Sequence, residues 1–122
     1  MNILLLIAHG SRREESNLEI ESLVRKISSF NTEEFDRVTH AFLEFANPNI
    51  EEAIRKCSNM GASSVTILPY FLSAGVHITR DIPEEICKAY AKNPNLKIKI
   101  ANYFGSRDEI AEILIKTALD IK

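Results

Sequence analysis

Two histidines and one glutamate in this sequence occupy positions from which side chains can do chemistry. His9 directly follows the apolar run 3–8, Glu44 lies at the end of a second apolar stretch, and His77 lies in a glycine-containing loop after a third. Two imidazoles and one carboxylate suit a divalent transition metal. They equally suit proton transfer near neutral pH, because histidine titrates in that range. Either chemistry requires the three residues to meet in space.

Apolar runs and helix signals alternate along the chain and predict four strands and four helices. The strands are predicted at 3–8, 37–45, 64–69 and 97–101. The first run is continuously apolar, as in a strand buried on both faces, whereas the last alternates lysine and isoleucine, which favours an edge strand. The helices are predicted from about Arg12 to 31–32, from Pro48 to Gly61, from Asp81 to about Lys92, and from Ser106 onward.

Capping signals predict where the helices begin, and apolar spacing predicts which faces they bury. Capping-box spacing occurs at three places, and Asn47 before Pro48 is typical of an N-cap with proline at the first helical position. The three boxes are Ser11 with Glu14, Asp81 with Glu84, and Ser106 with Glu109. Core faces at helical spacing are predicted for Ile20, Leu23, Val24 and Ile27, for Ile50, Ala53, Ile54 and Cys57, and for Ile110, Ile113, Leu114, Ala118 and Ile121.

Strands that alternate with helices predict a parallel sheet with helices on both faces. Right-handed crossovers favour the flavodoxin-like strand order 2-1-3-4, in a single three-layer α/β domain spanning residues 1–122. In such a sheet, ligands bind at the carboxyl ends of the strands where the winding reverses. Neighbouring strands lie about 4.8 Å apart, so this order predicts that His9, Glu44 and His77 share one cleft. His40 lies roughly 13 Å along the strand from Glu44 and is predicted to be structural.

Further residues near the same edge are candidates for holding a ligand. The arginines can pair with carboxylates, and the helix start around Ser11 can receive an anion. The two aromatic residues of the loop either line a flat ligand or pack beneath the loop, and the arginines are otherwise solvated surface residues. The predicted binding set is Ser11, Arg12, Arg13, Tyr70, Phe71, Ser73, Gly75 and Arg80.

The composition is that of an ordinary globular domain. The chain has 122 residues, of which 45 % are hydrophobic and 26 % charged, and a formal net charge of −2. This charge gives no support to a general nucleic-acid or membrane-surface binder. Cys57 and Cys87 form no CxxC pair, so they are expected to be reduced in a cytoplasmic protein. The apolar run 3–8 is too short for a signal peptide or a membrane span.

Three segments resemble the small CbiX-type sirohydrochlorin chelatases of the type II chelatase group. They are LLLIAHGSR at 4–12, AFLEFANPNIEEAI at 41–54 and ILPYFLSAGVHITRDIPEEI at 67–86. HGSR alone is a weak signal, but its combination with PYFLSAGVH and DIP at this separation is specific. One departure concerns the last helix, where many relatives carry a histidine and this chain reads NYFGSRDEIAEIL. The resemblance therefore supplies no third metal ligand from that element.

The resemblance implies insertion of a divalent metal into sirohydrochlorin without ATP and without a prosthetic group. Co²⁺ is favoured and Ni²⁺ and Fe²⁺ remain open, since members of the family supply cobalamin, sirohaem or nickel-tetrapyrrole biosynthesis. His9 and His77 match the active-site histidines and would bind the metal, and Glu44 matches the acidic residue of the second motif. Short members resemble half of the longer chelatases, which implies a homodimer.

Two other functions compete with this interpretation. A histidine-glycine pair after the first strand also occurs in histidine phosphatases, but those carry arginine before the histidine, where this chain has Ala8. A flavodoxin-like module that binds a metal or a tetrapyrrole without catalysis is the second alternative. The glycines form no GxGxxG run, so nucleotide binding is not indicated.

Overall fold

The computed structural model of the chain describes residues 1–30 and 33–121, and for His77 and Ile78 it describes the backbone alone. The predicted end of the first helix at Asn31 and Thr32 lies outside the described residues. The elements are β1 (Asn2–Ala8), α1 (Glu14–Ser28), β2 (Arg37–Phe42), α2 (Ile50–Asn59), β3 (Ser64–Pro69), the π-helix η1 (His77–Asp81), α3 (Ile82–Lys92), β4 (Lys97–Ile100), the short 3₁₀ helix η2 (Phe104–Ser106) and α4 (Glu109–Leu119).

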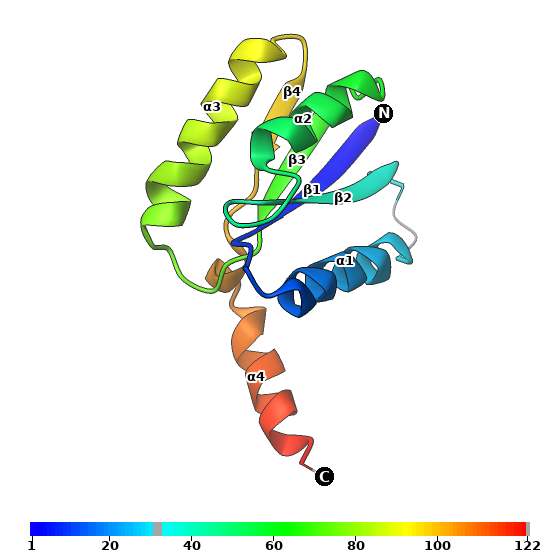
Figure 1. Ribbon diagram of the computed structural model, residues 1–122. Helices are drawn as coiled ribbons and strands as arrows, with labels where there is room; N and C mark the ends of the chain where they lie inside the picture. Colours follow the sequence, from blue (N-terminus) through cyan, green and yellow to red (C-terminus); the bar gives the residue numbers. More distant parts are fainter. Residues whose placement is uncertain (31–32, 122) are drawn as a thin grey trace.

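The four strands form one parallel sheet in the order β2-β1-β3-β4, which confirms the predicted order. Ile7 of β1 lies opposite Ala41 of β2 and Pro69 of β3, so the carboxyl ends of these three strands are level. β4 is an edge strand, as its alternating pattern predicts. Helices α2 and α3 cover one face of the sheet, and α1 lies on the other (Figure 1).

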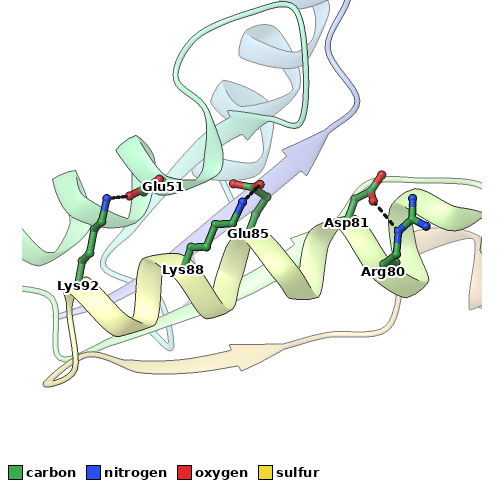
Figure 2. A network of polar contacts seen from close by, with 6 residues as sticks. All are labelled: Glu51, Arg80, Asp81, Glu85, Lys88 and Lys92. Atoms are coloured by element: carbon green, nitrogen blue, oxygen red, sulfur yellow. Dashed lines mark hydrogen bonds and ion pairs between the residues drawn. The ribbon is translucent and has the colours of Figure 1, made fainter.

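The main core lies between the sheet and helices α2 and α3. Alternate residues of β1 point into it, and Ile3, Leu5 and Ile7 are fully buried. Full burial of such a side chain stabilises the fold by about 1.5–3 kcal/mol. The predicted face of α2 is confirmed and is joined by three residues of α3: the helix contributions are Ile50, Ala53, Ile54, Cys57, Ile82, Ile86 and Ala89. At the surface an ion pair between Lys92 and Glu51 also links these two helices (Figure 2).

Of the three predicted capping boxes, two place the helix start two residues too early, and one places it correctly but without a side-chain cap bond. Helix α1 begins two residues later than the Ser11 box implies, with Arg13 at the N-cap and no side-chain cap bond. Asp81 is the N-cap of α3, as predicted, but its backbone is already helical where η1 runs into α3, and its side chain makes no cap hydrogen bond. At α4 the N-cap is Asp108 rather than Ser106, since residues 104–106 form η2.

The segment between β2 and α2 also differs from its prediction. β2 ends at Phe42 rather than Phe45, because the chain turns at Phe45, whose φ of 68° is positive. The N-cap of α2 is Asn49 and not Asn47: its Oδ1 accepts a hydrogen bond from the Glu52 N–H at 2.8 Å. Gly61 follows the end of α2 with a φ of +89°, which confirms the predicted stop.

Helix α4 contradicts the prediction that its apolar residues join the core. Every residue of α4 is described and none is buried. Figure 1 shows the helix leaving the carboxyl end of β4 and projecting away from the sheet. No helix in the described part of the chain is both long and apolar enough to cross a lipid bilayer.

Candidate functional site

Backbone hydrogen bonds hold the carboxyl ends of three strands together beyond the strands themselves. The N–H of Leu43 donates to Ala8 O, and the N–H of Glu44 donates to His9 O, both at 2.9 Å. On the other side of β1, the N–H of Tyr70 donates to Ile7 O at 2.7 Å. The ladder therefore places His9, Glu44 and the loop after β3 at one edge of the sheet, as the strand order predicts.

The side chains of His9 and Glu44 meet at this edge. His9 Nε2 lies 3.3 Å from Glu44 Oε2, and the two side chains are 42 % and 47 % exposed. His9 Nδ1 is 3.0 Å from the carbonyl oxygen of Gly10. Because a carbonyl oxygen only accepts, Nδ1 is the donor in this bond. In the neutral imidazole, Nε2 then turns a lone pair toward a carboxylate, which is also an acceptor.

Two acceptors at this distance are favourable only when a cation lies between them. A proton on Nε2 meets this need, and so does a metal ion bound to both atoms. Ligand atoms each about 2.1 Å from a metal, at angles between octahedral and tetrahedral, lie roughly 3.0–3.4 Å apart. The 3.3 Å separation of His9 Nε2 and Glu44 Oε2 fits this range. The geometry of the pair is thus compatible with a shared proton or with a bound divalent metal.

Two side chains alone are an incomplete metal site. Within the described residues, no group of three or more histidine, cysteine, aspartate or glutamate side chains is arranged to hold a metal ion. The prediction for His77 concerns its side chain, which lies outside what the structure describes. Its backbone begins η1, directly after the β3 loop. A metal held by His9 and Glu44 would therefore need ligands beyond the described side chains.

Phe45 is a site residue that the sequence analysis missed. Its ring is 53 % exposed and lies 6.0 Å from the His9 ring between centroids. The guanidinium carbon of Arg12 lies 4.8 Å from the centre of the same ring, within cation–π range. A positive φ is unfavourable for a bulky residue, so the turn holds Phe45 here at a cost in backbone strain. Phe45 thus contacts both Arg12 and the ring of His9.

The loop from His9 to Arg13 is shaped by close backbone contact and by Asn17. Asn17 Nδ2 donates to Ser11 O at 2.8 Å, and Asn17 Oδ1 accepts from the Ser11 N–H at 3.0 Å. The Ser11 hydroxyl accepts from the Arg13 N–H at 3.0 Å. Ser11, one of the predicted binding residues, therefore stabilises the loop in which it lies. Arg13 points along the helix to Glu15, with Nε 3.3 Å from Oε2.

The loop after β3 carries the remaining predicted residues, which point in different directions. The Tyr70 ring packs 5.6 Å from the ring of Phe104, and Phe71 is half-buried against the main core. Ser73 is exposed, and the carbonyl oxygen of Gly75 accepts from the Thr79 N–H at 3.1 Å. Tyr70 and Phe71 thus pack against other residues of the same chain.

Arg80 lies on η1, where its Nε pairs with Asp81 Oδ1 at 3.2 Å (Figure 2). A small cavity of about 150 Å³ beside this pair is lined by Leu43, Glu44, Asp81, Glu84 and Glu85. Four carboxylates thus surround the cavity next to the His9–Glu44 pair. Asp81 pairs with Arg80 and Glu85 pairs with Lys88, so the lining keeps a smaller net negative charge, which favours cations.

His40 lies apart from this site, as predicted for a structural histidine. It is on β2, with its ring 5.2 Å from the Phe42 ring in an edge-on arrangement. Burial lowers the pKa of His40, and the nearby Lys56 adds to this effect while Glu21 opposes it. His40 is therefore kept in its neutral form at neutral pH.

Comparison with known proteins places these observations in one family. The sequence model of the CbiX family matches residues 3–120. The chain is 34 % identical to a sirohydrochlorin cobaltochelatase of Sulfurisphaera tokodaii, over 91 % of this chain and 86 % of that protein. It is 31 % identical to a sirohydrochlorin ferrochelatase of Priestia megaterium, over 95 % of this chain and 43 % of that protein.

The structure agrees with these sequence matches. The sirohydrochlorin chelatase SirB of Bacillus subtilis subspecies spizizenii, solved in complex with cobalt, superimposes with a TM-score of 0.88. The two are 26 % identical, and the match covers 98 % of this chain and 50 % of SirB. The chain thus spans about half the length of some relatives and most of the length of others. By its sequence match over nearly its whole length, and by its fold, the chain belongs to the CbiX family.

Proposed function

We propose that this protein inserts a divalent metal ion into sirohydrochlorin without ATP. The observation that carries the proposal is the His9–Glu44 pair, with two acceptor atoms 3.3 Å apart at the carboxyl edge of the sheet. Membership of the CbiX family and the chelatase names of the relatives support the same reaction. No prosthetic group is required, because the metal itself is a substrate.

Metal insertion has to exchange charge at the centre of the macrocycle. Two pyrrole N–H protons leave as the divalent ion enters, so the ring gains a dication and loses two protons. His9 Nε2 and Glu44 would first hold the ion while its water is removed, and would then take up the protons that it displaces. His77 is proposed to face the macrocycle from the other strand end. The acidic cavity beside Glu44 supplies cations to the pair.

The substrate is a polycarboxylate, and the site offers positive charge for it. Arg12 is held over Phe45 beside His9, so its guanidinium is placed to pair with a carboxylate at the rim of the ring. Arg13 and Arg80 are exposed and would exchange their present partners for further carboxylates. Ser73 and Gly75 lie on the exposed loop that would face the ring.

The physiological metal is not fixed by this donor set. Imidazole and carboxylate ligands suit Co²⁺, Ni²⁺ and Fe²⁺ alike, and relatives named for cobalt and for iron are similar to the chain at comparable identity. We propose Co²⁺ as the first metal to test. We also propose that the chain acts as a cytoplasmic homodimer, and the two free thiols, Cys57 and Cys87, support a reducing compartment.

The proposal is tested by following the visible spectrum of sirohydrochlorin with Co²⁺, Ni²⁺ or Fe²⁺. We expect wild-type protein to convert the free-base spectrum to the metallated one faster than buffer alone. His9→Ala and Glu44→Gln should each lose most of this acceleration. His40→Gln is the matched control, since His40 lies outside the site, and it should retain the wild-type rate.

Two outcomes would contradict this mechanism. If the wild-type protein shifts the tetrapyrrole spectrum on binding but does not accelerate insertion, the chain is a carrier rather than a chelatase. If His9→Ala and His40→Gln lose activity equally, the His9–Glu44 pair is not the centre of the reaction.

A further inference from the structure

A second cavity lies at the outer edge of the sheet, where β2 meets helix α2. Its volume of about 520 Å³ falls within the range of about 300–1,000 Å³ that is typical of small-molecule sites. β2 is an edge strand with β1 as its neighbour, so the cavity opens at the border of the sheet (Figure 1). None of the described residues that line it belongs to the His9–Glu44 pair or to the acidic cavity beside that pair. It is therefore a separate candidate site.

Apolar side chains form much of the cavity wall. Ala53 of α2 is buried there, Pro48 precedes the helix, and Met60 follows its last residue. Met60 is 41 % exposed, so a molecule bound in the cavity would remove apolar surface from water. Such a wall favours a ligand with an apolar body.

Lys56 gives the cavity a positive charge. It is exposed, and it is the one side chain charged at neutral pH among the described residues that line the cavity. No carboxylate of a described residue lies within ion-pair distance of its ammonium group. The other polar side chains of the lining include the neutral amide of Asn59 and the neutral hydroxyl of Thr39. Although the chain carries a net charge of −2, this cavity therefore attracts an anion.

The free edge of β2 adds a main-chain hydrogen-bond donor. The N–H of Leu43 points to β1, where it donates to Ala8 O, whereas the N–H of Phe42 points away from β1 and donates to Pro48 O at 2.8 Å. Successive N–H groups alternate in direction along a strand, so the N–H of His40 points away from β1, as that of Phe42 does. No strand of the described chain lies on that side of β2. His40 lines the cavity and therefore offers its N–H at this edge.

We propose that this cavity binds a small organic monocarboxylate with an apolar body. The carboxylate pairs with the Lys56 ammonium group and accepts a hydrogen bond from the His40 N–H, and the apolar body covers Met60. A peptide added as a further strand needs more of this edge, because the Phe42 N–H is already bonded to Pro48 O. The proposal does not depend on the proposed chelatase activity.

The test uses naphthoate as the probe and naphthamide as its uncharged counterpart. Each is titrated into the isotope-labelled full-length protein, and the backbone amide chemical shifts are followed by NMR. We expect saturable shifts with naphthoate, largest at the amides of His40, Lys56 and Met60. Naphthamide should bind about 3–10-fold more weakly, because it lacks the charge that pairs with Lys56.

Three variants separate the charge from the apolar wall. Lys56→Gln should weaken naphthoate binding by about 3–10-fold and leave naphthamide binding unchanged, since it removes the charge alone. Lys99→Gln is the matched control, because this exposed lysine lies on β4 at the opposite edge of the sheet, and it should change neither affinity. Met60→Ser should weaken the binding of both ligands, because apolar contact is lost.

Several results would overturn the proposal. Equal affinity for naphthoate and naphthamide would show that the charge of the cavity plays no part. Shifts confined to another surface, residues 9–13 beside the candidate site included, would place the anion elsewhere. The absence of any saturable shift up to the solubility limit of naphthoate would show that no such site exists. Neither metal nor tetrapyrrole is present in these titrations, so a failure here is separate from a failure of the proposed chelatase activity.

Discussion

Replacing Gly10 by alanine tests whether the site is built on a close contact between two backbone segments. Gly10 has a φ of +91°, and a Cβ atom there would lie 1.8 Å from the carbonyl oxygen of Glu44. Gly61 has a φ of +89° but no atom within 4 Å of such a Cβ. The two positions therefore share the conformational cost and differ in the steric one, which makes Gly61→Ala a matched control.

The expected magnitudes follow from this difference. A positive φ costs an L-residue about 1–2 kcal/mol, partly offset by the lower entropy of the unfolded chain with alanine. Gly61→Ala should therefore lower the free energy of unfolding by about 1 kcal/mol. At Gly10 the backbone must also move to relieve the contact, which adds about 1–3 kcal/mol. Gly75→Ala, with open space and no positive φ, should cost nothing.

Urea unfolding at one fixed protein concentration measures these differences. With a slope of about 2 kcal/mol/M, Gly10→Ala should lower the midpoint by roughly 1–2 M and Gly61→Ala by about 0.5 M. Gly10→Ala should also slow metal insertion, because relief of the contact moves Glu44. Equal midpoints for the two variants would refute the argument that Gly10 is required by its contact with Glu44 rather than by φ alone.

Three further predictions concern side chains around and outside the site. Phe45→Ala should raise the KM for sirohydrochlorin at least about 2–5-fold, because the contact with Arg12 is lost. Phe45→Gly should unfold at a higher urea concentration than Phe45→Ala, because glycine tolerates the positive φ. Equal urea midpoints for these two variants would contradict backbone strain at Phe45. Because burial lowers the pKa of His40, the unfolded chain binds more protons than the folded chain at mildly acidic pH. Stability should therefore fall as the pH drops through and below about 6.5. The melting temperature of His40→Gln should depend less on pH, and an unchanged pH dependence would exclude His40 as the cause. Burial raises the pKa of the Cys57 thiol to about 11. Iodoacetamide at pH 8 should therefore label only the exposed Cys87 until urea unfolds the chain. Rapid labelling of Cys57 in the native protein would contradict its burial.

The sheet was predictable from sequence because its signals are local and redundant. The continuous apolar run in β1, the alternation in β4 and the apolar face of α2 each specify burial, and only a few strand orders are compatible with right-handed crossovers. The meeting of His9 and Glu44 follows from that order alone. For this reason the sequence alone predicts that His9 and Glu44, two of the three candidate catalytic residues, lie at the same edge of the sheet.

The features that the sequence did not predict depend on contacts between backbone segments that are distant in the sequence. Nothing in the residue type of Phe45 signals a left-handed turn, which is imposed by the chain between β2 and α2. The capping-box patterns fit the local spacing, but η1 leads directly into α3, and η2 occupies the residues where the cap of α4 is predicted. For α4 the apolar spacing predicts a core face, but the helix leaves the domain after η2 and none of its residues is buried.

The backbone hydrogen bonds from Leu43 to Ala8 and from Glu44 to His9 position the two site residues without the help of their side chains. The spacing between positions 9 and 44 is set by main-chain hydrogen bonds, so it would be the same for any pair of side chains at these positions. A substitution at either position changes the donor atom offered to a metal without moving the strand that carries it. Metal preference in such a protein is therefore free to diverge by single amino-acid replacements, while the fold that aligns the donors stays the same.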